Sequence, residues 1–126
     1  MQFSDNKPIY LQIADSISDK ILREELAAED RIPSVREYAA EIGVNPNTLM
    51  HTYEYLSKEG IIHSKRGLGY YVSGKAREII LNLGRTQFFE KELPRLLERM
   101  LLLEIPTEQV LNAILMSQSL HSSGRL

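Results

Sequence analysis

The chain has 126 residues, of which 43% are hydrophobic and 25% charged, and this favours one compact domain or a small domain with an appendage. The net charge of -2 excludes a protein that is basic throughout, and the lack of cysteine excludes a disulfide framework, a thiolate metal site and a cysteine nucleophile. No apolar run approaches the roughly 18 residues of a membrane span, so we expect no membrane partner and a cytoplasmic location.

The first predicted helix begins at Pro8, which fits a first helical turn because its missing N–H would have no partner there. Apolar residues then recur every four positions along one face, at Ile9, Ile13, Ile17 and Ile21. The segment 30–33 breaks this pattern. Ser34 follows where the N-cap of a short second helix belongs, and Gly43 is expected to end that helix.

A third helix is predicted from Pro46, with Asn45 as its cap. Its apolar stripe is narrow and consists of Leu49, Tyr53 and Leu56. The first turn is polar and lies off this stripe, with Asn47, Thr48 and His51 among its residues. A helix buried on all sides would carry apolar residues there, so we predict that this end of the helix contacts a partner.

The pattern changes after the third helix. Residues 61–64 and 70–73 are predicted to form two short strands, joined by residues 65–69, whose two glycines supply the positive φ angles of a tight hairpin. In the second strand, Tyr70 and Tyr71 point to opposite faces. One is expected in the core, and the other could reach a phosphate.

The remainder of the chain, beyond Gly74, has a helical pattern again. Pro94 is expected to break or kink this run unless a new helix begins near Glu92. A final helix is predicted after Pro106. The polar tail from Ser117 onward is expected to be frayed.

The predicted order of helix, helix, turn, helix and hairpin is that of a winged helix-turn-helix. We therefore predict a mainly α fold with a small β-hairpin, organised as a DNA-binding domain over residues 1–74 and a short α-helical dimerisation region over residues 75–126. This fold accounts for the polar start of the third helix, because a recognition helix enters the major groove by its N-terminus.

The charge distribution agrees with this prediction better than the net charge does. Residues 1–30 carry three basic and seven acidic groups, residues 31–75 carry six and four, and residues 76–126 carry six and six. The positive balance is confined to the middle segment, which permits a local basic face around the third helix and the hairpin.

The run from Pro8 to Val72 closely resembles the DNA-binding domain of GntR-family bacterial transcription regulators. The resemblance rests on PIYLQIADSI, IPSVREYAAEIGVNPNT, YEYLSKEGII and GLGYYV, and it covers about half of the chain. The short helical remainder resembles the YtrA-like branch of that family. The resemblance implies a homodimeric repressor that binds an operator in double-stranded DNA. We expect no cofactor.

Ten residues are predicted to contact DNA: Ser34, Arg36, Asn45, Asn47, Thr48, His51, Lys65, Arg66, Gly67 and Gly69. The resemblance implies that Arg36 reaches a phosphate or a guanine, and that the two glycines form the tip of the wing. Relatives often carry arginine where this chain has Pro46 and Met50. Direct guanine readout by the third helix is therefore expected to be weaker, with Arg36 and the wing taking a larger share.

Each of these residues also has a purely structural interpretation. Arg36 could pair with a neighbouring acid such as Glu37, and Asn45 could serve only as a cap. His51 could be a bystander on the exposed side of its helix. The cations at 65–66 could belong to a solvated turn, although two cations before a glycine-tipped turn suit a wing lying along a DNA backbone or minor groove.

The C-terminal half contains too many large apolar residues for one helix face. Seven of them are predicted to pair two subunits: Phe88, Phe89, Leu93, Leu96, Leu97, Met100 and Leu101. An isologous two-fold dimer would bury this surface. Packing within one subunit is the alternative.

Two other classes of function remain open at this stage. A winged helix could be a protein-interaction module that docks a partner on its acidic first helix and never binds DNA. An enzyme would need a nucleophile with its base, paired carboxylates or a phosphate-binding loop, and the sequence offers none of these. No metal-ligand spacing surrounds His51. The sequence leaves open whether a small-molecule effector binds.

Overall fold

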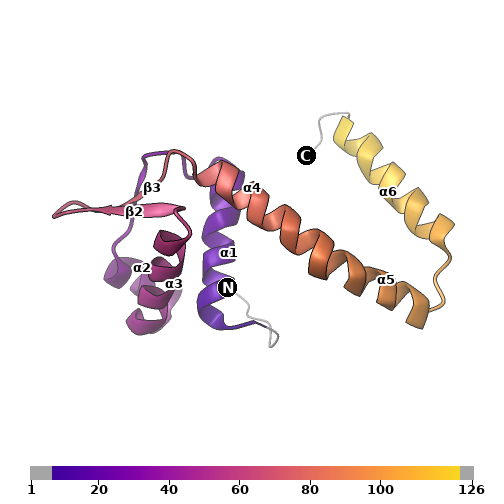
Figure 1. Ribbon diagram of the computed structural model, residues 1–126, viewed down its shortest axis with the longest axis horizontal. Helices are drawn as coiled ribbons and strands as arrows, with labels where there is room; N and C mark the ends of the chain where they lie inside the picture. The colour runs from indigo at the N-terminus through magenta and orange to yellow at the C-terminus, as the bar shows by residue number, and fades with distance from the viewer. Residues whose placement is uncertain (1–6, 123–126) are drawn as a thin grey trace. The chain divides into compact units, whose positions relative to one another are not determined.

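The computed structural model describes residues 7–122. Its elements in chain order are α1 (Ile9–Leu22), β1 (Arg31–Ile32), α2 (Val35–Ile42), α3 (Pro46–Lys58), β2 (Ile62–Lys65), β3 (Gly69–Val72), α4 (Ala76–Gln87), the π-helical η1 (Phe88–Glu92), α5 (Leu93–Leu102) and α6 (Thr107–Ser122) (Figure 1). The predicted fold class, mainly helical with a small antiparallel sheet, is confirmed.

The chain divides into two compact units, an N-terminal unit of residues 1–84 and a C-terminal unit of residues 85–126. The division falls inside α4, ten residues after the domain boundary expected from the sequence. The N-terminal unit contains the three helices and the sheet of the winged helix-turn-helix.

Side-chain caps fix where α2 and α3 begin. The Glu37 N–H donates to Ser34 Oγ and the Ser34 N–H donates to Glu37 Oε1, each over 3.1 Å, which forms a complete capping box. Asn45 Oδ1 accepts the Asn47 N–H over 2.7 Å at the start of α3. Gly43, with φ of 72°, ends α2 in the left-handed conformation that glycine tolerates. The predicted caps are confirmed.

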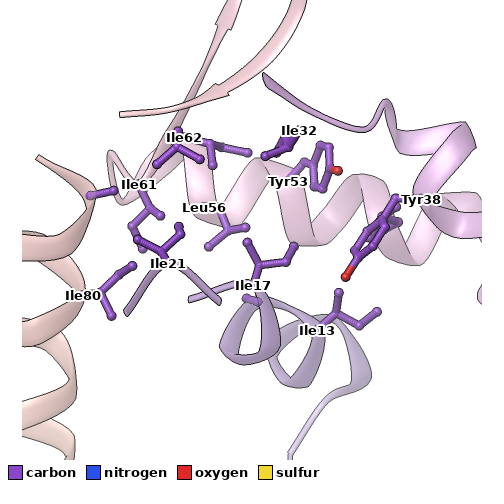
Figure 2. Close-up of a cluster of buried hydrophobic side chains, with 14 of the residues drawn as sticks. Ile13, Ile17, Ile21, Ile32, Tyr38, Tyr53, Leu56, Ile61, Ile62 and Ile80 are labelled. Atoms are coloured by element: carbon purple, nitrogen blue, oxygen red, sulfur yellow. The ribbon is translucent and has the colours of Figure 1, made fainter. Parts of the chain in front are cut away.

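The core of the N-terminal unit lies between α1, α2, α3 and the sheet, and α4 adds Ala76 and Ile80 to it (Figure 2). The apolar face of α1 meets the stripe of α3. The large apolar side chains that are most completely buried in this core are Tyr53, Ile13, Leu49, Leu56, Ile61, Ile62 and Val72. This packing leaves only the opposite side of α3 free for a partner.

The sheet has a third strand that the sequence analysis did not predict. β1 pairs antiparallel with β3, placing Arg31 opposite Tyr71, and the strand order is β1-β3-β2. Two residues are too few to show the alternation that marks a strand, and β1 exists only because β3 lies beside it. Both hairpin strands lie one residue closer to the turn than predicted, at residues 62–65 and 69–72.

Pro94 does not break the helical path of the C-terminal unit. The Leu93 N–H donates to the carbonyl of Phe88, five residues back, and α5 starts with Pro94 in its first turn. This matches the expected alternative of a new helix near Glu92. The expectation of fraying from Ser117 is wrong, because α6 continues to Ser122 and neither glycine nor proline interrupts it. The tail's last residues, 123–126, lie outside the described residues.

Candidate nucleic-acid interface

The start of α3 presents a polar tip to solvent. Asn45, Asn47 and His51 are exposed and Thr48 is half-buried, whereas Leu49 on the opposite side is fully buried. The side chain of Asn45 uses only its oxygen in the cap, so its amide N–H groups stay available to an acceptor. The tip therefore offers hydrogen-bonding groups on a helix end whose position the core fixes.

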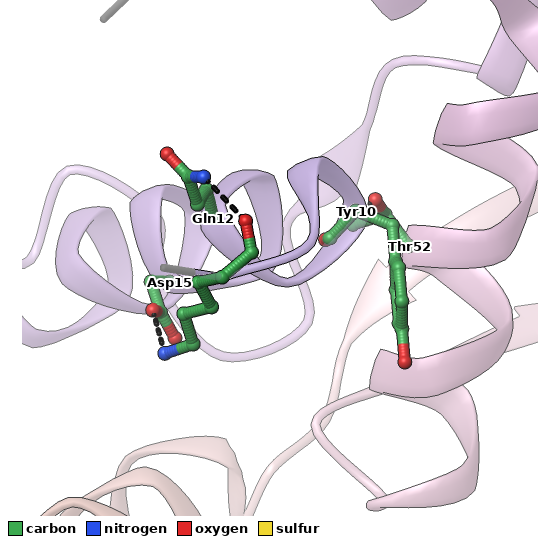
Figure 3. Close-up of polar contacts among 5 residues, drawn as sticks. Tyr10, Gln12, Asp15 and Thr52 are labelled. Atoms are coloured by element: carbon green, nitrogen blue, oxygen red, sulfur yellow. Dashed lines mark hydrogen bonds and ion pairs between the residues drawn. The ribbon is translucent and has the colours of Figure 1, made fainter. Parts of the chain in front are cut away.

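The ring of Tyr10, on α1, stacks on the imidazole of His51. The ring centroids are 3.6 Å apart and the planes differ by 11°. Tyr10 also meets Tyr55 edge to face, with ring centroids 6.4 Å apart. The backbone carbonyl of Tyr10 accepts a hydrogen bond from the buried Thr52 Oγ1 over 2.8 Å (Figure 3). His51 thus packs against a ring of the first helix. No local pattern indicates this contact, because the two rings belong to different helices that lie far apart in the chain.

Arg36 lies on the exposed side of α2, next to the cap. The alternative that Arg36 pairs with a neighbouring acid is not seen among residues 7–122, because Glu37 turns back to its capping box. The Ser34 backbone N–H, and then its hydroxyl, hold the pKa of Glu37 below its usual value. Ser34 Oγ accepts the Glu37 N–H, so this side chain and the carboxylate of Glu37 are engaged with each other at the start of α2.

The wing, formed by β2, β3 and the tight turn between them, carries cations on its exposed side. Gly67 and Gly69 have φ of 76° and 99°, so each adopts a conformation that side chains rarely do. Lys65 Nζ lies 4.2 Å from the centroid of the Tyr71 ring, a cation–π contact, and Arg66 is exposed at the turn. The exposed cations of this hairpin suit contact with a sugar-phosphate backbone.

Arg31 adds a third cation to the wing, which the sequence pattern does not predict. Its Nε donates to the Leu68 carbonyl over 3.1 Å, and a Cβ placed on Gly69 would stand only 3.3 Å from that nitrogen. The positive φ of Gly69 already favours glycine there, and the Arg31 side chain is the nearest group to that position. Arg31 escaped notice because only the pairing of β1 with β3 brings it to the wing.

The two tyrosines of β3 divide as predicted. Tyr70 meets the buried Tyr53 edge to face, with ring centroids 5.0 Å apart, and packs against the core. Tyr71, on the other face, contacts Lys65 and His63. Its hydroxyl donates only a long hydrogen bond of 3.4 Å to the Leu68 carbonyl.

The seven residues predicted to form a dimer surface lie on η1 and α5, and most of them are exposed. Leu101 is 81% exposed and Phe89 65%, whereas Leu93 and Met100 are partly covered. The exposed apolar surface extends to α6, through Leu111, Ile114, Leu115, Met116 and Leu120. Within the described chain, these side chains have no core to enter.

Two further kinds of site are absent from residues 7–122. No group of three or more histidine, aspartate or glutamate side chains there is arranged to hold a metal ion. No helix in this range is both long and apolar enough to cross a membrane.

Comparison with known proteins agrees with the arrangement of the N-terminal unit. Residues 9–72 match the family model described as bacterial regulatory proteins, gntR family. Over 113 residues the chain is 40% identical to the uncharacterized HTH-type transcriptional regulator YhcF of Bacillus subtilis, covering 90% of this chain and 92% of YhcF. It is 37% identical over 90 residues to the HTH-type transcriptional repressor YtrA of the same organism, covering 71% of this chain and 68% of YtrA.

A solved structure has the same fold over nearly the whole chain. A GntR family transcriptional regulator from Listeria monocytogenes matches 89% of this chain and 96% of its own, with a TM-score of 0.71 and 32% identity. The resemblance stated from the sequence is confirmed, including its likeness to YtrA. The chain therefore belongs to the GntR family, and it is a DNA-binding transcriptional regulator.

Proposed function

We propose that two copies of this chain form a cytoplasmic repressor that binds a pseudo-palindromic operator and blocks transcription of neighbouring genes. The observation that carries the proposal is the exposed polar tip of α3, which stands opposite a fully buried stripe on the same helix. Such a helix can enter the major groove while its other face stays in the core. The similarity to the repressor YtrA supports the direction of regulation.

The predicted contacts divide by what each group can recognise. Asn47, Thr48 and His51 at the tip would contact base edges, where an asparagine can pair with adenine through two hydrogen bonds. Arg36 and the wing cations would contact phosphates, which position the protein without reading sequence. Phosphate contacts would supply most of the affinity and make it depend on salt.

The remaining predicted residues would support these contacts. Ser34 and Asn45 cap the two helices and would place their N-termini against the backbone of the duplex, where the unused amide N–H groups of Asn45 could donate to a phosphate. Gly67 and Gly69 would let the wing backbone approach the duplex closely. In this proposal residues 1–74 bind DNA and residues 75–126 pair the subunits.

The exposed apolar residues of the C-terminal unit support pairing. A surface of this kind is typical of an interface, and a second copy of the same unit offers the same apolar surface. A two-fold dimer would set two α3 helices against successive half-sites about one turn of DNA apart. Operator symmetry would then mirror the symmetry of the dimer.

The DNA surface can be tested once an operator is known. Sequencing the genomic fragments that the purified protein selects would supply it, and a half-site repeat would support the dimer. Arg36→Ala and Lys65→Ala are each expected to weaken binding and to lower the slope of log affinity against log salt by about one. Lys58→Ala, at the far end of α3, is the matched control and is expected to bind as the parent does.

The outcomes separate the proposal from its rival. If both variants bind the operator as the parent does, the assigned surface is wrong. If no fragment is selected at low salt, the proposed repressor function is wrong and the protein-interaction module becomes the better hypothesis.

A further inference from the structure

Glu29 stands in a backbone conformation that is unusual for its residue type. Its φ is 69°, in the left-handed region that favours glycine or asparagine. The Glu29 N–H donates to the Val72 carbonyl over 2.8 Å, and the Val72 N–H donates to the Asp30 carbonyl over 2.9 Å. The strand β3 therefore fixes Glu29 in place. A strained position that keeps a charged side chain raises the question of what that side chain does.

The carboxylate of Glu29 lies beside two basic side chains of β2. Its Oε1 is 4.0 Å from Lys65 Nζ and 3.9 Å from His63 Nε2. On its other side, His63 Nδ1 lies 3.4 Å from Ser73 Oγ. Lys65 is therefore held between a carboxylate and the ring of Tyr71.

The neighbouring charged residues do not share this arrangement. Asp30 Oδ2 accepts the Ala27 N–H over 2.8 Å and belongs to its own turn. Arg31 is bound to the Leu68 carbonyl, and Arg66 has no ion pair with the part of the chain that the structure describes. Among the described wing cations, Lys65 is the one with an acidic partner.

We propose that Glu29 restrains Lys65 and thereby weakens the contact between the wing and the DNA backbone. The inference rests on the proposed DNA-binding function. A phosphate that approaches Lys65 would meet the Glu29 carboxylate at the same ammonium group, so the two anions compete for it. Because phosphate contacts carry no sequence information, the restraint lowers affinity for any duplex and leaves base recognition by α3 unchanged. Glu29 is thus a residue that sets the strength of binding.

Glu29→Gln tests the restraint, because it removes the charge and keeps the size of the side chain and the backbone requirement. Glu25→Gln is the matched control: it makes the same change in net charge at an exposed residue that forms no ion pair with a described residue. Both full-length variants are titrated with the selected operator and with a 30-base-pair duplex of mixed sequence. Glu29→Gln is expected to bind both duplexes about two- to fivefold more tightly than Glu25→Gln, the range of an exposed ion pair.

A double-mutant cycle identifies Lys65 as the group being restrained. Lys65→Ala is expected to weaken binding by a larger factor in the Glu29→Gln background than in the parent. Equal factors in the two backgrounds would overturn the proposal, because Glu29 would then act on the phosphate directly. Equal binding by Glu29→Gln and Glu25→Gln would also overturn it.

The test of Glu29 can fail without contradicting the proposed DNA-binding function. If the parent binds the operator and Arg36→Ala weakens it, DNA binding stands whatever Glu29 does. If the parent fails to bind DNA at all, the proposed function fails and the inference fails with it. Thermal unfolding of each variant confirms that the compared proteins are folded.

Discussion

The two units of the chain contain similar apolar residues, but these are buried in the N-terminal unit and exposed in the C-terminal unit. In the N-terminal unit, the isoleucines and leucines of α1, α3 and the sheet enter one core. In the C-terminal unit, no described side chain is fully buried, although leucine is frequent there. Helical periodicity thus shows which residues need burial. It does not show whether the burying surface belongs to the same chain.

Size explains the difference. The C-terminal unit has about forty residues, and chains of that length seldom bury enough surface to fold alone. Burial is worth about 25 cal/mol for each Å² of apolar surface, so the exposed residues of η1, α5 and α6 have a strong drive to associate. The comparison predicts that mutations in the two units act on different equilibria.

The largest expected effect comes from truncating a leucine in each unit. Leu49 is 0% exposed, so Leu49→Ala is expected to lower the free energy of unfolding by about 2–5 kcal/mol, since a cavity remains in the core. Leu101 is 81% exposed in the single chain, so Leu101→Ala is expected to leave the N-terminal unit intact and to weaken self-association. Urea denaturation and sedimentation velocity at several protein concentrations measure the two quantities.

The same two variants can also contradict the proposed difference between the two units. If Leu101→Ala lowers stability as much as Leu49→Ala does at a concentration where the parent is monomeric, the C-terminal unit has a core of its own. If the parent stays monomeric at every concentration tested, the exposed apolar surface has another partner and the dimer proposal is wrong.

A smaller effect is expected from the buried hydroxyl of Tyr53. It donates to the Pro33 carbonyl over 2.6 Å and ties α3 to the segment before α2. Tyr53→Phe is expected to lower the free energy of unfolding by about 1–2 kcal/mol, the usual loss when a buried partner is left unpaired. Tyr71→Phe is the matched control, because the hydroxyl of Tyr71 makes only a long contact at the exposed wing.

The same tyrosine gives a dependence on pH. Burial raises the pKa of Tyr53 well above its usual value. The folded protein therefore keeps the phenol protonated where the unfolded chain ionises, and stability is fully present below about pH 10 and lost as the pH rises beyond that. Tyr53→Phe is expected to flatten this alkaline loss. An unchanged alkaline profile would mean that other groups cause it.

The sequence predicted the parts of the fold that depend on neighbouring residues. Both caps at Ser34 and Asn45, the left-handed Gly43 and the apolar stripes of α1 and α3 follow rules that act within about four residues, and the structure has them all. The polar tip was identified for the same reason, because residues off a helical stripe can be read from spacing alone.

The features that escaped prediction join residues far apart in the chain. Arg31 reaches the wing only through a two-residue strand, and His51 is oriented by Tyr10 on another helix. Glu29 meets Lys65 only because β3 holds both segments. Local patterns carry no information on such contacts, so they predict which residues at the start of α3 lie off its apolar stripe but not how the residues of the candidate site are arranged.

The smallest expected effect on stability comes from the caps at the helix N-termini, which differ between the two units. In the N-terminal unit α2 has a full capping box, whereas α5 starts without a side-chain cap. Ser34→Ala is expected to lower the free energy of unfolding by about 1 kcal/mol, because the Glu37 N–H loses its acceptor. Ser57→Ala, at an exposed site inside α3, is the control and is expected to be neutral or slightly stabilising.

The acid side of the stability profile distinguishes the cap from a general loss of packing. The pKa of Glu37 is lowered in the folded protein, so its contribution is present above the ordinary glutamate pKa and is lost as the pH falls through the lower folded value. Removing the Ser34 hydroxyl takes away one cause of that shift, so the pKa of Glu37 is expected to rise in Ser34→Ala. An NMR titration measures it directly. A pKa that stays where it was would show that the backbone N–H of Ser34 alone holds the carboxylate, and that the hydroxyl serves only the helix.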